Sequence, residues 1–150
     1  MLLGLLPGGC DHRSGAGHER RRDLGDLQQA RSLHERALAI PASPAEEARA
    51  RLALALDQIA LGDGDAALQQ LDALASLQID AGHPYLMAAR LQRAAALRLA
   101  GRHEEALRIA QLAAREFATR HLVPSQIAAH IEEQKILRAA GRFDAALQAA

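Results

Sequence analysis

Apolar residues recur every three or four positions along most of the chain after about residue 24, with polar and charged residues between them. The row Leu68, Leu71 and Leu74, continued by Leu77, is one example. Such spacing places the apolar side chains along one side of an α-helix. An apolar side of this kind needs neighbours to cover it, so we expect several helices that pack against one another.

Start and stop signals divide this pattern into about six helices. Ser43, Pro44 and Glu46 predict a helix start with a capping box, and Pro84 and Pro124 mark two further starts. The expected helices span residues 27–40, 44–61, 65–82, 84–101, 103–121 and 124–141, followed by a partner helix over 143–150 that the end of the chain cuts off. Short connections at glycines predict antiparallel hairpins.

A short motif recurs at even intervals. Gly followed by Asp or Arg, three further residues and Ala begins at Gly25, Gly62, Gly101 and Gly141, at intervals of 37, 39 and 40 residues. Glycine ends helices because it adopts the left-handed backbone conformation easily. Regular intervals of this length are typical of stacked helical repeats. A compact helical bundle with accidental periodicity is the alternative, and the even spacing argues against it.

The composition favours an all-α fold. Aromatic residues make up 2% of the chain, and most apolar residues are Ala and Leu, which are strong helix formers. A β-sandwich or barrel uses many more aromatic and β-branched residues. With 49% hydrophobic residues, the chain also has enough apolar material to exclude wholesale disorder.

The first 23 residues differ from the rest. Residues 8–23 are rich in Gly and charge, so we expect residues 1–23 to be a flexible leader and 24–150 to be the helical domain. A lipid anchor at Cys10 is an alternative, although Pro7 and the missing positive start do not suit such a signal. Cys10, His12 and His18 lack the paired spacing of a zinc site.

Charge and cysteine content narrow the classes of partner. The chain has 18 basic and 18 acidic residues, a formal net charge of zero, so nothing global favours nucleic acid or an anionic membrane. No apolar run reaches the length that crosses a bilayer. A single cysteine excludes an internal disulfide and fits a reducing compartment, so we expect a cytoplasmic protein without a membrane span.

The repeated unit resembles the tetratricopeptide repeat family, whose helix–turn–helix units have Gly at the turn and small residues at fixed positions. The four glycines match the turn; Ala30, Ala67, Ala106 and Ala146 match the position five residues later; Ala55 and Ala94 match the position seven before; Ala37 and Ala113 match the position twelve after. Gln134 and Leu74 depart from this pattern, and the period exceeds the usual 34 residues. The resemblance implies a right-handed α-α superhelix, a solenoid of antiparallel helix hairpins with about three units, the last one truncated.

The resemblance also implies a concave groove lined by the first helix of each unit. The family's register places the following residues there: Arg49, Leu52, Leu56 and Ile59; Ala88, Leu91, Ala95 and Arg98; Ala128, Ile131, Lys135 and Arg138. Cations at the edges of an apolar groove suit an acidic or C-terminal-carboxylate peptide with an apolar anchor. Alternatively, the leucines only pack against the neighbouring helix.

The sequence contains no recognisable catalytic, cofactor or metal motif. No His pairs with another at i, i+4, and "HIEEQK" at residues 130–135 has no matching Glu-x-x-His on a second helix. "GDGDAA" at residues 62–67 lacks the remaining ligands of a calcium loop and is better interpreted as a turn with an N-cap. We therefore expect neither catalysis nor a cofactor.

Two hypotheses about function follow. The first is a scaffold that binds another protein or peptide in the groove, with homodimerisation through open solenoid ends as a further expectation. The second is that the chain is the repeat or sensor segment of a larger bacterial signalling protein, such as a transcriptional regulator or a Ser/Thr kinase.

Overall fold

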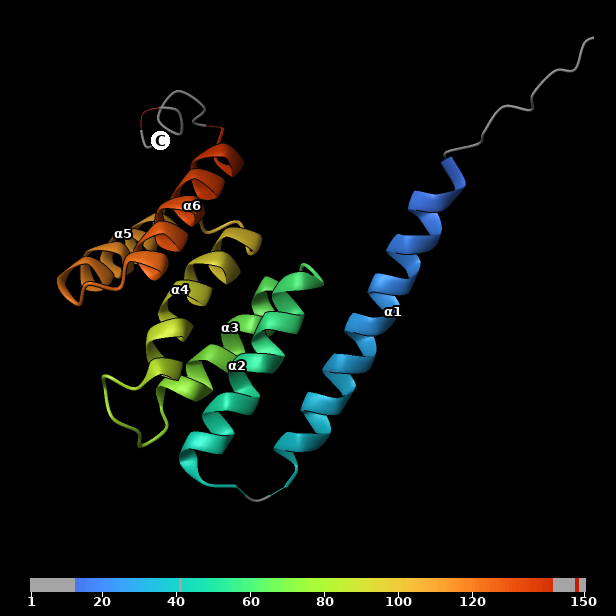
Figure 1. Ribbon diagram of the computed structural model, residues 1–150, viewed down its shortest axis with the longest axis horizontal. Coiled ribbons are helices and arrows are strands. Elements are labelled where there is room, and N and C mark those ends of the chain that lie inside the picture. The colour runs from blue at the N-terminus through green and yellow to red at the C-terminus, as the bar shows by residue number, and fades with distance from the viewer. Residues whose placement is uncertain (1–12, 41, 142–147, 149–150) are drawn as a thin grey trace, which may run out of the picture.

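The computed structural model describes residues 13–40, 42–141 and 148 of the chain. In these residues the only regular structure is helical (Figure 1). The six helices are α1 (Arg13–Leu38), α2 (Pro44–Ala60), α3 (Gly64–Ala75), α4 (Pro84–Leu99), α5 (His103–Thr119) and α6 (Val123–Ala139). The all-α class predicted from composition is confirmed.

The predicted helix starts are confirmed where a polar side chain caps the helix. The Ser43 hydroxyl accepts a hydrogen bond from the Glu46 N–H at 3.3 Å, and the Glu46 carboxylate accepts one from the Ser43 N–H at 3.0 Å. This capping box satisfies N–H groups that have no partner within α2. Asp63 caps α3 by accepting a hydrogen bond from the Ala66 N–H at 3.0 Å.

Three of the four motif glycines end a helix. Gly62, Gly101 and Gly141 have φ values of +83°, +78° and +74°. At Gly101 the N–H donates to the Arg98 carbonyl, and the next N–H, of Arg102, donates to the Leu97 carbonyl at 2.9 Å. This pair of bonds is the Schellman motif, which glycine makes without steric cost.

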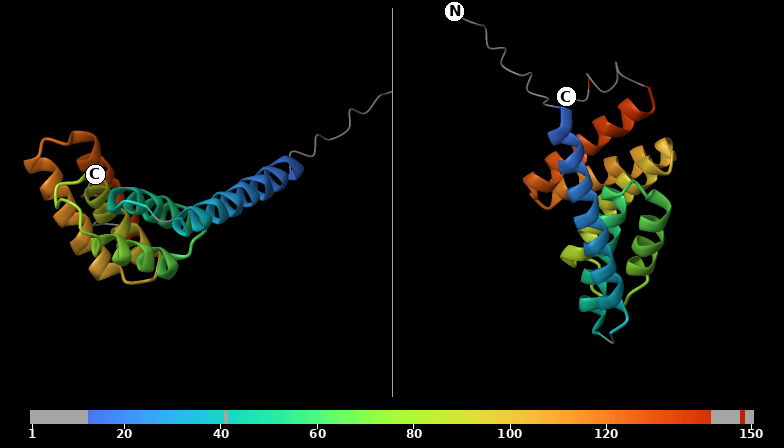
Figure 2. Two further views of the ribbon diagram at one scale, coloured as in Figure 1. Left: turned by 90° about the horizontal axis from the view of Figure 1, so that it is seen from below. Right: turned by 90° about the vertical axis from the view of Figure 1, so that its right-hand side faces the viewer.

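The fourth motif glycine does not form the expected turn. Gly25 lies inside α1, which is continuous from Arg13 to Leu38, so the helix also includes residues 13–23 that we expected in the leader. No atom lies within 4 Å of a Cβ added at Gly25. Within the described residues, α1 contacts only α2, and its N-terminal part extends beyond the other helices (Figure 2). No earlier helix is present in this part of the chain to pack against a turn at this position.

The predicted end of α3 is also wrong. The helix ends at Ala75, with Ser76 as its C-cap, whereas the sequence pattern extended it to Gly82. Leu77 and Ile79 nevertheless pack against the main core from the connection that follows. The apolar spacing therefore predicted correctly that these residues are buried, but it did not predict where the helix ends.

Small residues lie where helices approach closely. Ala55 of α2, Ala67 of α3, Ala94 of α4 and Ala106 of α5 are completely buried, as the repeat pattern predicts. Close backbone approach requires small side chains at helix crossings. Ala37 is an exception: it is exposed on α1, because the helix that would cover it is missing from the described residues.

The helices form two sets. α2 contacts α4, and α4 contacts α6, while α1, α3 and α5 have no contacts with one another in the described part of the chain. α3 packs against α2 and α4, and α5 packs against α4 and α6. We call the first set the α2–α4–α6 row. Packing between consecutive helices is consistent with stacked hairpins.

Candidate functional site

The predicted groove residues lie on the α2–α4–α6 row, and their exposure differs between its members. On the outer helices, Leu56 of α2 is 43% exposed and Ile131 of α6 is 48% exposed. Arg49, Ala128, Lys135 and Arg138 are exposed as well. Leu52 and Ile59 of α2 are partly buried and pack against the main core, so for these two residues packing is the better interpretation.

On the middle helix the same register positions are more buried. Ala95 of α4 is 6% exposed, and Ala88, Leu91 and Arg98 are partly buried. This difference follows from the packing, because α4 has both α2 and α6 beside it.

The structure brings three of the predicted residues together around one pocket. Ala88 and Leu91 of α4 face Ala128 of α6 across a pocket of about 610 Å³ between the N-terminal halves of these helices. Met87, Phe117, Leu122, Pro84 and Pro124 complete most of its apolar lining. We call it the α4–α6 pocket. A concave apolar site of this size fits an amino-acid side chain or a short peptide segment.

Sequence reasoning missed the other residues of this pocket, among them Met87, Phe117 and Leu122. Met87 and Phe117 belong to a second core cluster with Ala113, Ala114 and Ala129, and Leu91 packs against this cluster. Phe117 could have been singled out in the sequence as a residue of the site, since the chain contains only two phenylalanines. Its position beside α4 depends on how α5 crosses that helix, which the local pattern does not specify.

Towards the C-terminal ends of α4 and α6, charged residues replace the apolar ones. The Nε of Arg98 donates a hydrogen bond of 2.6 Å to Oε1 of Glu132, and the Lys135 ammonium lies 3.7 Å from Oε2 of the same carboxylate. Glu132 is only 7% exposed. The predicted cation Arg98 is therefore engaged in an ion pair between α4 and α6, with a carboxylate that the groove register did not include.

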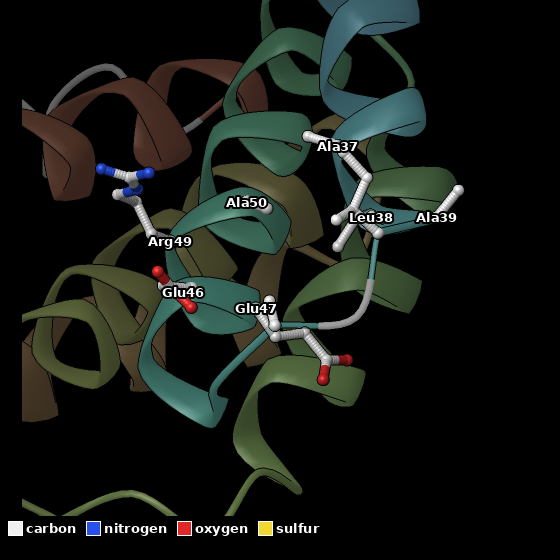
Figure 3. Close-up of a pocket in the computed structure, with 9 residues that line it drawn as sticks. Ala37, Leu38, Ala39, Glu46, Glu47, Arg49 and Ala50 are labelled. Atoms are coloured by element: carbon white, nitrogen blue, oxygen red, sulfur yellow. The ribbon is translucent and has the colours of Figure 1, made fainter.

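A second pocket lies at the other end of the row. About 530 Å³ of space separates the end of α1 from the start of α2, lined by Leu38, Ile40, Ala50, Glu46 and Glu47 among others. Figure 3 shows Arg49 pointing away from the α1 residues that border this pocket. Arg49 also borders a smaller pocket formed with His83, Pro84 and Tyr85 at the start of α4. Arg49 therefore lies at the border between these two pockets.

Two histidines and one glutamate are engaged in structural contacts. His34 Nδ1 of α1 lies 2.5 Å from Asp57 Oδ2 of α2, and His130 Nδ1 lies 2.7 Å from Glu133 Oε2 within α6. Hydrogen bonds from the Ser43 N–H and then from its hydroxyl lower the pKa of Glu46, because both stabilise the ionised carboxylate.

No group of three or more His, Cys, Asp or Glu residues capable of holding a metal ion occurs among the described residues. Cys10 and His12 lie outside those residues, so the alternatives of a lipid anchor and a metal site there stay untested. In the described part of the chain, no helix combines the length and apolar character that a membrane crossing requires.

Comparison of the chain with protein-family models, with curated proteins and with solved structures found no significant match. We therefore base the proposed function on the residues of the site itself.

Proposed function

We propose that the protein is an interaction scaffold of the tetratricopeptide-repeat type, in which the α2–α4–α6 row forms a concave groove that binds a peptide or helix of another protein. In this proposal the hairpins stack as a right-handed solenoid. The α4–α6 pocket is the observation that carries the proposal, because it is apolar, open to solvent and bordered by groove-register residues of two helices.

The exposed residues of the row support this proposal. Leu56 and Ile131 each leave more than two fifths of their surface in contact with water. Ile131 lies about one turn beyond the pocket residue Ala128 on α6, and contiguous exposed apolar surface at a pocket is typical of surfaces that bind other proteins. Residues in these positions of a solenoid face the ligand, whereas α3 and α5 pack behind them.

We further propose that the protein acts by binding, without catalysis, in the cytoplasm. The ionisable groups named above support a structural role, since His34 and His130 each have a carboxylate partner. The single cysteine suits a reducing compartment.

Selection of binders from a random peptide library tests the proposal. Peptides selected on the wild-type protein should lose at least about tenfold in affinity, roughly 1.4 kcal/mol, when Ala128→Phe places a ring over the pocket. Ala118→Phe is the matched control, because Ala118 is also an exposed helical alanine but does not line this pocket. Isothermal titration calorimetry measures each affinity.

The proposal is wrong if selection yields no peptide that binds the folded protein. It is equally wrong if the selected peptides bind Ala128→Phe as tightly as wild type, because the occupied surface then lies elsewhere.

A further inference from the structure

Another pocket lies on the side of α4 opposite the α4–α6 pocket. The end of α3, the connection 76–83 and four residues of α4 line it, and its volume is about 350 Å³. The α4 residues are Leu86, Ala89, Arg90 and Arg93. They lie about half a turn around the helix from the α4 residues of the α4–α6 pocket. We call this second site the α3–α4 pocket. No described residue lines both pockets, so each can be occupied on its own.

The α3–α4 pocket is related to the early end of α3. In the next hairpin α5 is longer, and its residue Phe117 belongs to the same core cluster as Ala129 of α6. Counted from the turn glycine of each unit, Phe117 corresponds to Gln78, which lies in the connection after α3 and is exposed. In the same way Ala129 corresponds to Ala89, which lines the pocket. The position that supplies a buried ring in the second hairpin is therefore exposed in the first, and space remains beside Ala89.

The interior of the α3–α4 pocket is apolar and lies against the main core. Leu71 of α3 is 1% exposed, and Ala89 is 6% exposed. Leu77 and Ile79 of the connection and Leu86 of α4 also pack against this core while they line the pocket. Pockets that bind small ligands have mostly apolar walls and volumes of about 300–1,000 Å³. A pocket of this size and lining suits the short apolar chain of a small molecule.

Among the described residues, the only charged side chains that line this pocket are two arginines. The side chains of Arg93 and Arg90 are 34% and 46% exposed, so they lie at the solvent side of the pocket. Each pairs with a carboxylate that does not line the pocket. The Nη2 of Arg93 lies 2.5 Å from Oδ1 of Asp72 on α3, and Arg90 pairs with Glu116 on α5. These pairs hold the two guanidinium groups at the edge of the apolar space.

The two ion pairs leave hydrogen-bond donors for a ligand. A guanidinium group has five N–H donors, and a bidentate carboxylate accepts two of them. The side chain of Asp72 is 60% exposed, and an ion pair so open to water is weak. A second carboxylate can therefore bind Arg93 beside Asp72 or in its place. Because two carboxylates balance the two arginines, specificity comes from which groups border the pocket and not from an excess of positive charge.

We propose that the α3–α4 pocket binds a small amphiphilic carboxylate, a molecule with a carboxylate group and a linear apolar tail. The tail contacts Leu71, Leu77 and Ile79, and the carboxylate accepts hydrogen bonds from Arg93 and Arg90. This site lies outside the groove to which we assign peptide binding, so the inference does not depend on the proposed function.

Three eight-carbon probes test the inference with the full chain: octanoate, octan-1-ol and octylammonium. Each probe is titrated into the ¹⁵N-labelled protein, and the amide shift changes report both affinity and location. Octanoate should bind at least about threefold more tightly than either other probe, because charge-assisted hydrogen bonds to guanidinium are stronger than neutral ones. The largest changes should occur at Leu77, Ile79 and Arg93.

Two variants assign the binding to the pocket. Arg93→Gln should weaken octanoate about twofold to fivefold and leave octanol unchanged, because it removes a cation but no apolar wall. Ala75→Phe should weaken both probes at least about fivefold, because Ala75 is exposed at the end of α3 and a ring there occupies the pocket. Arg108→Gln and Ala118→Phe are matched controls, since both residues are exposed on α5 and do not line the pocket. Circular dichroism checks that each variant is folded.

The inference is overturned if octanoate binds no more tightly than octanol or octylammonium, or if the shift changes concentrate at the α4–α6 pocket. It is also overturned if Ala75→Phe has no more effect than Ala118→Phe, or if octanoate causes no shift changes below its micelle concentration. If Ala75→Phe does not fold, Arg93→Gln compared with Arg108→Gln decides. None of these outcomes affects the proposed groove, whose peptide binding is tested separately by Ala128→Phe.

Discussion

At the scale of single residues, the backbone conformation at helix ends depends on which residue stands there. Gly62, Gly101 and Gly141 occupy the left-handed region, where glycine has no Cβ to clash. His121 occupies the same position after α5, with φ of +56°. Its N–H donates to the Ala118 carbonyl, and the next N–H, of Leu122, donates to the Phe117 carbonyl, as at Gly101. His121 is the one non-glycine residue with positive φ among the described residues.

We therefore predict that His121→Gly stabilises the protein. Relief of the left-handed strain should exceed the extra chain entropy of glycine, raising the free energy of unfolding by about 0.5–1 kcal/mol. Gly101→Ala is the reverse change and should lower it by a similar amount. Urea unfolding measures both; a lower midpoint for His121→Gly would show that the histidine side chain makes a stabilising contact at this turn.

The carboxylate of Glu46 should make stability depend on pH. Its pKa is lowered from an ordinary value of 4.5 by the Ser43 hydrogen bonds, so the unfolded chain binds this proton more readily than the folded one. The stabilisation is complete above pH 4.5 and is lost as the pH falls through the lower folded value. Glu46→Gln keeps a capping side chain but does not titrate.

The difference in unfolding midpoint between wild type and Glu46→Gln should therefore be largest at neutral pH and shrink on acidification below 4.5. Thermal unfolding across pH 2.5–7 measures this difference. A difference that stays constant over the whole range would contradict the role assigned to the capping box.

At the scale of elements, the sequence predicted helix starts and turns where one residue decides the local conformation. Ser43 with Glu46, and the three glycines with positive φ, are such cases. The same motif at Gly25 was misleading, since a turn also needs a preceding helix to pack against. The sequence did not indicate that Gly64 of α3 lies against the backbone of α4. A Cβ at Gly64 would lie 2.5 Å from the Ala96 carbonyl oxygen.

The candidate site was predictable only in part, for a related reason. The register found Leu91, Ala128 and Arg98 because each follows from position along its own helix. Glu132, Met87 and Phe117 depend on how α4, α5 and α6 cross. Crossing geometry arises from packing between helices, and no local sequence pattern determines it.

We predict opposite effects of alanine at two motif glycines. Gly25→Ala should raise the free energy of unfolding by about 0.5–1 kcal/mol, because Gly25 lies within a helix and has open space around it. Gly62→Ala should lower it, because Gly62 has φ of +83°. Urea unfolding compares the two variants; destabilisation by Gly25→Ala would show that α1 turns at this position after all.

At the scale of the whole molecule, α3 and α5 support the α2–α4–α6 row, which in our proposal binds the ligand. α3 and α5 each pack against two members of the α2–α4–α6 row, and the main core lies between them. The α4–α6 pocket of this row is open to solvent. A ligand on this row would contact three helices at once, so its affinity should depend on how they stack.

The central claim is that a ligand occupies the α2–α4–α6 row at the α4–α6 pocket. Amide shift changes in the ¹⁵N-labelled protein, recorded on addition of a library-selected peptide, test it most directly. We predict the largest changes at Met87, Leu91, Leu122, Ala128 and Ile131, with little change along the exposed sides of α3 and α5. Changes concentrated on α3, α5 or α1, with none at the pocket, would contradict the account.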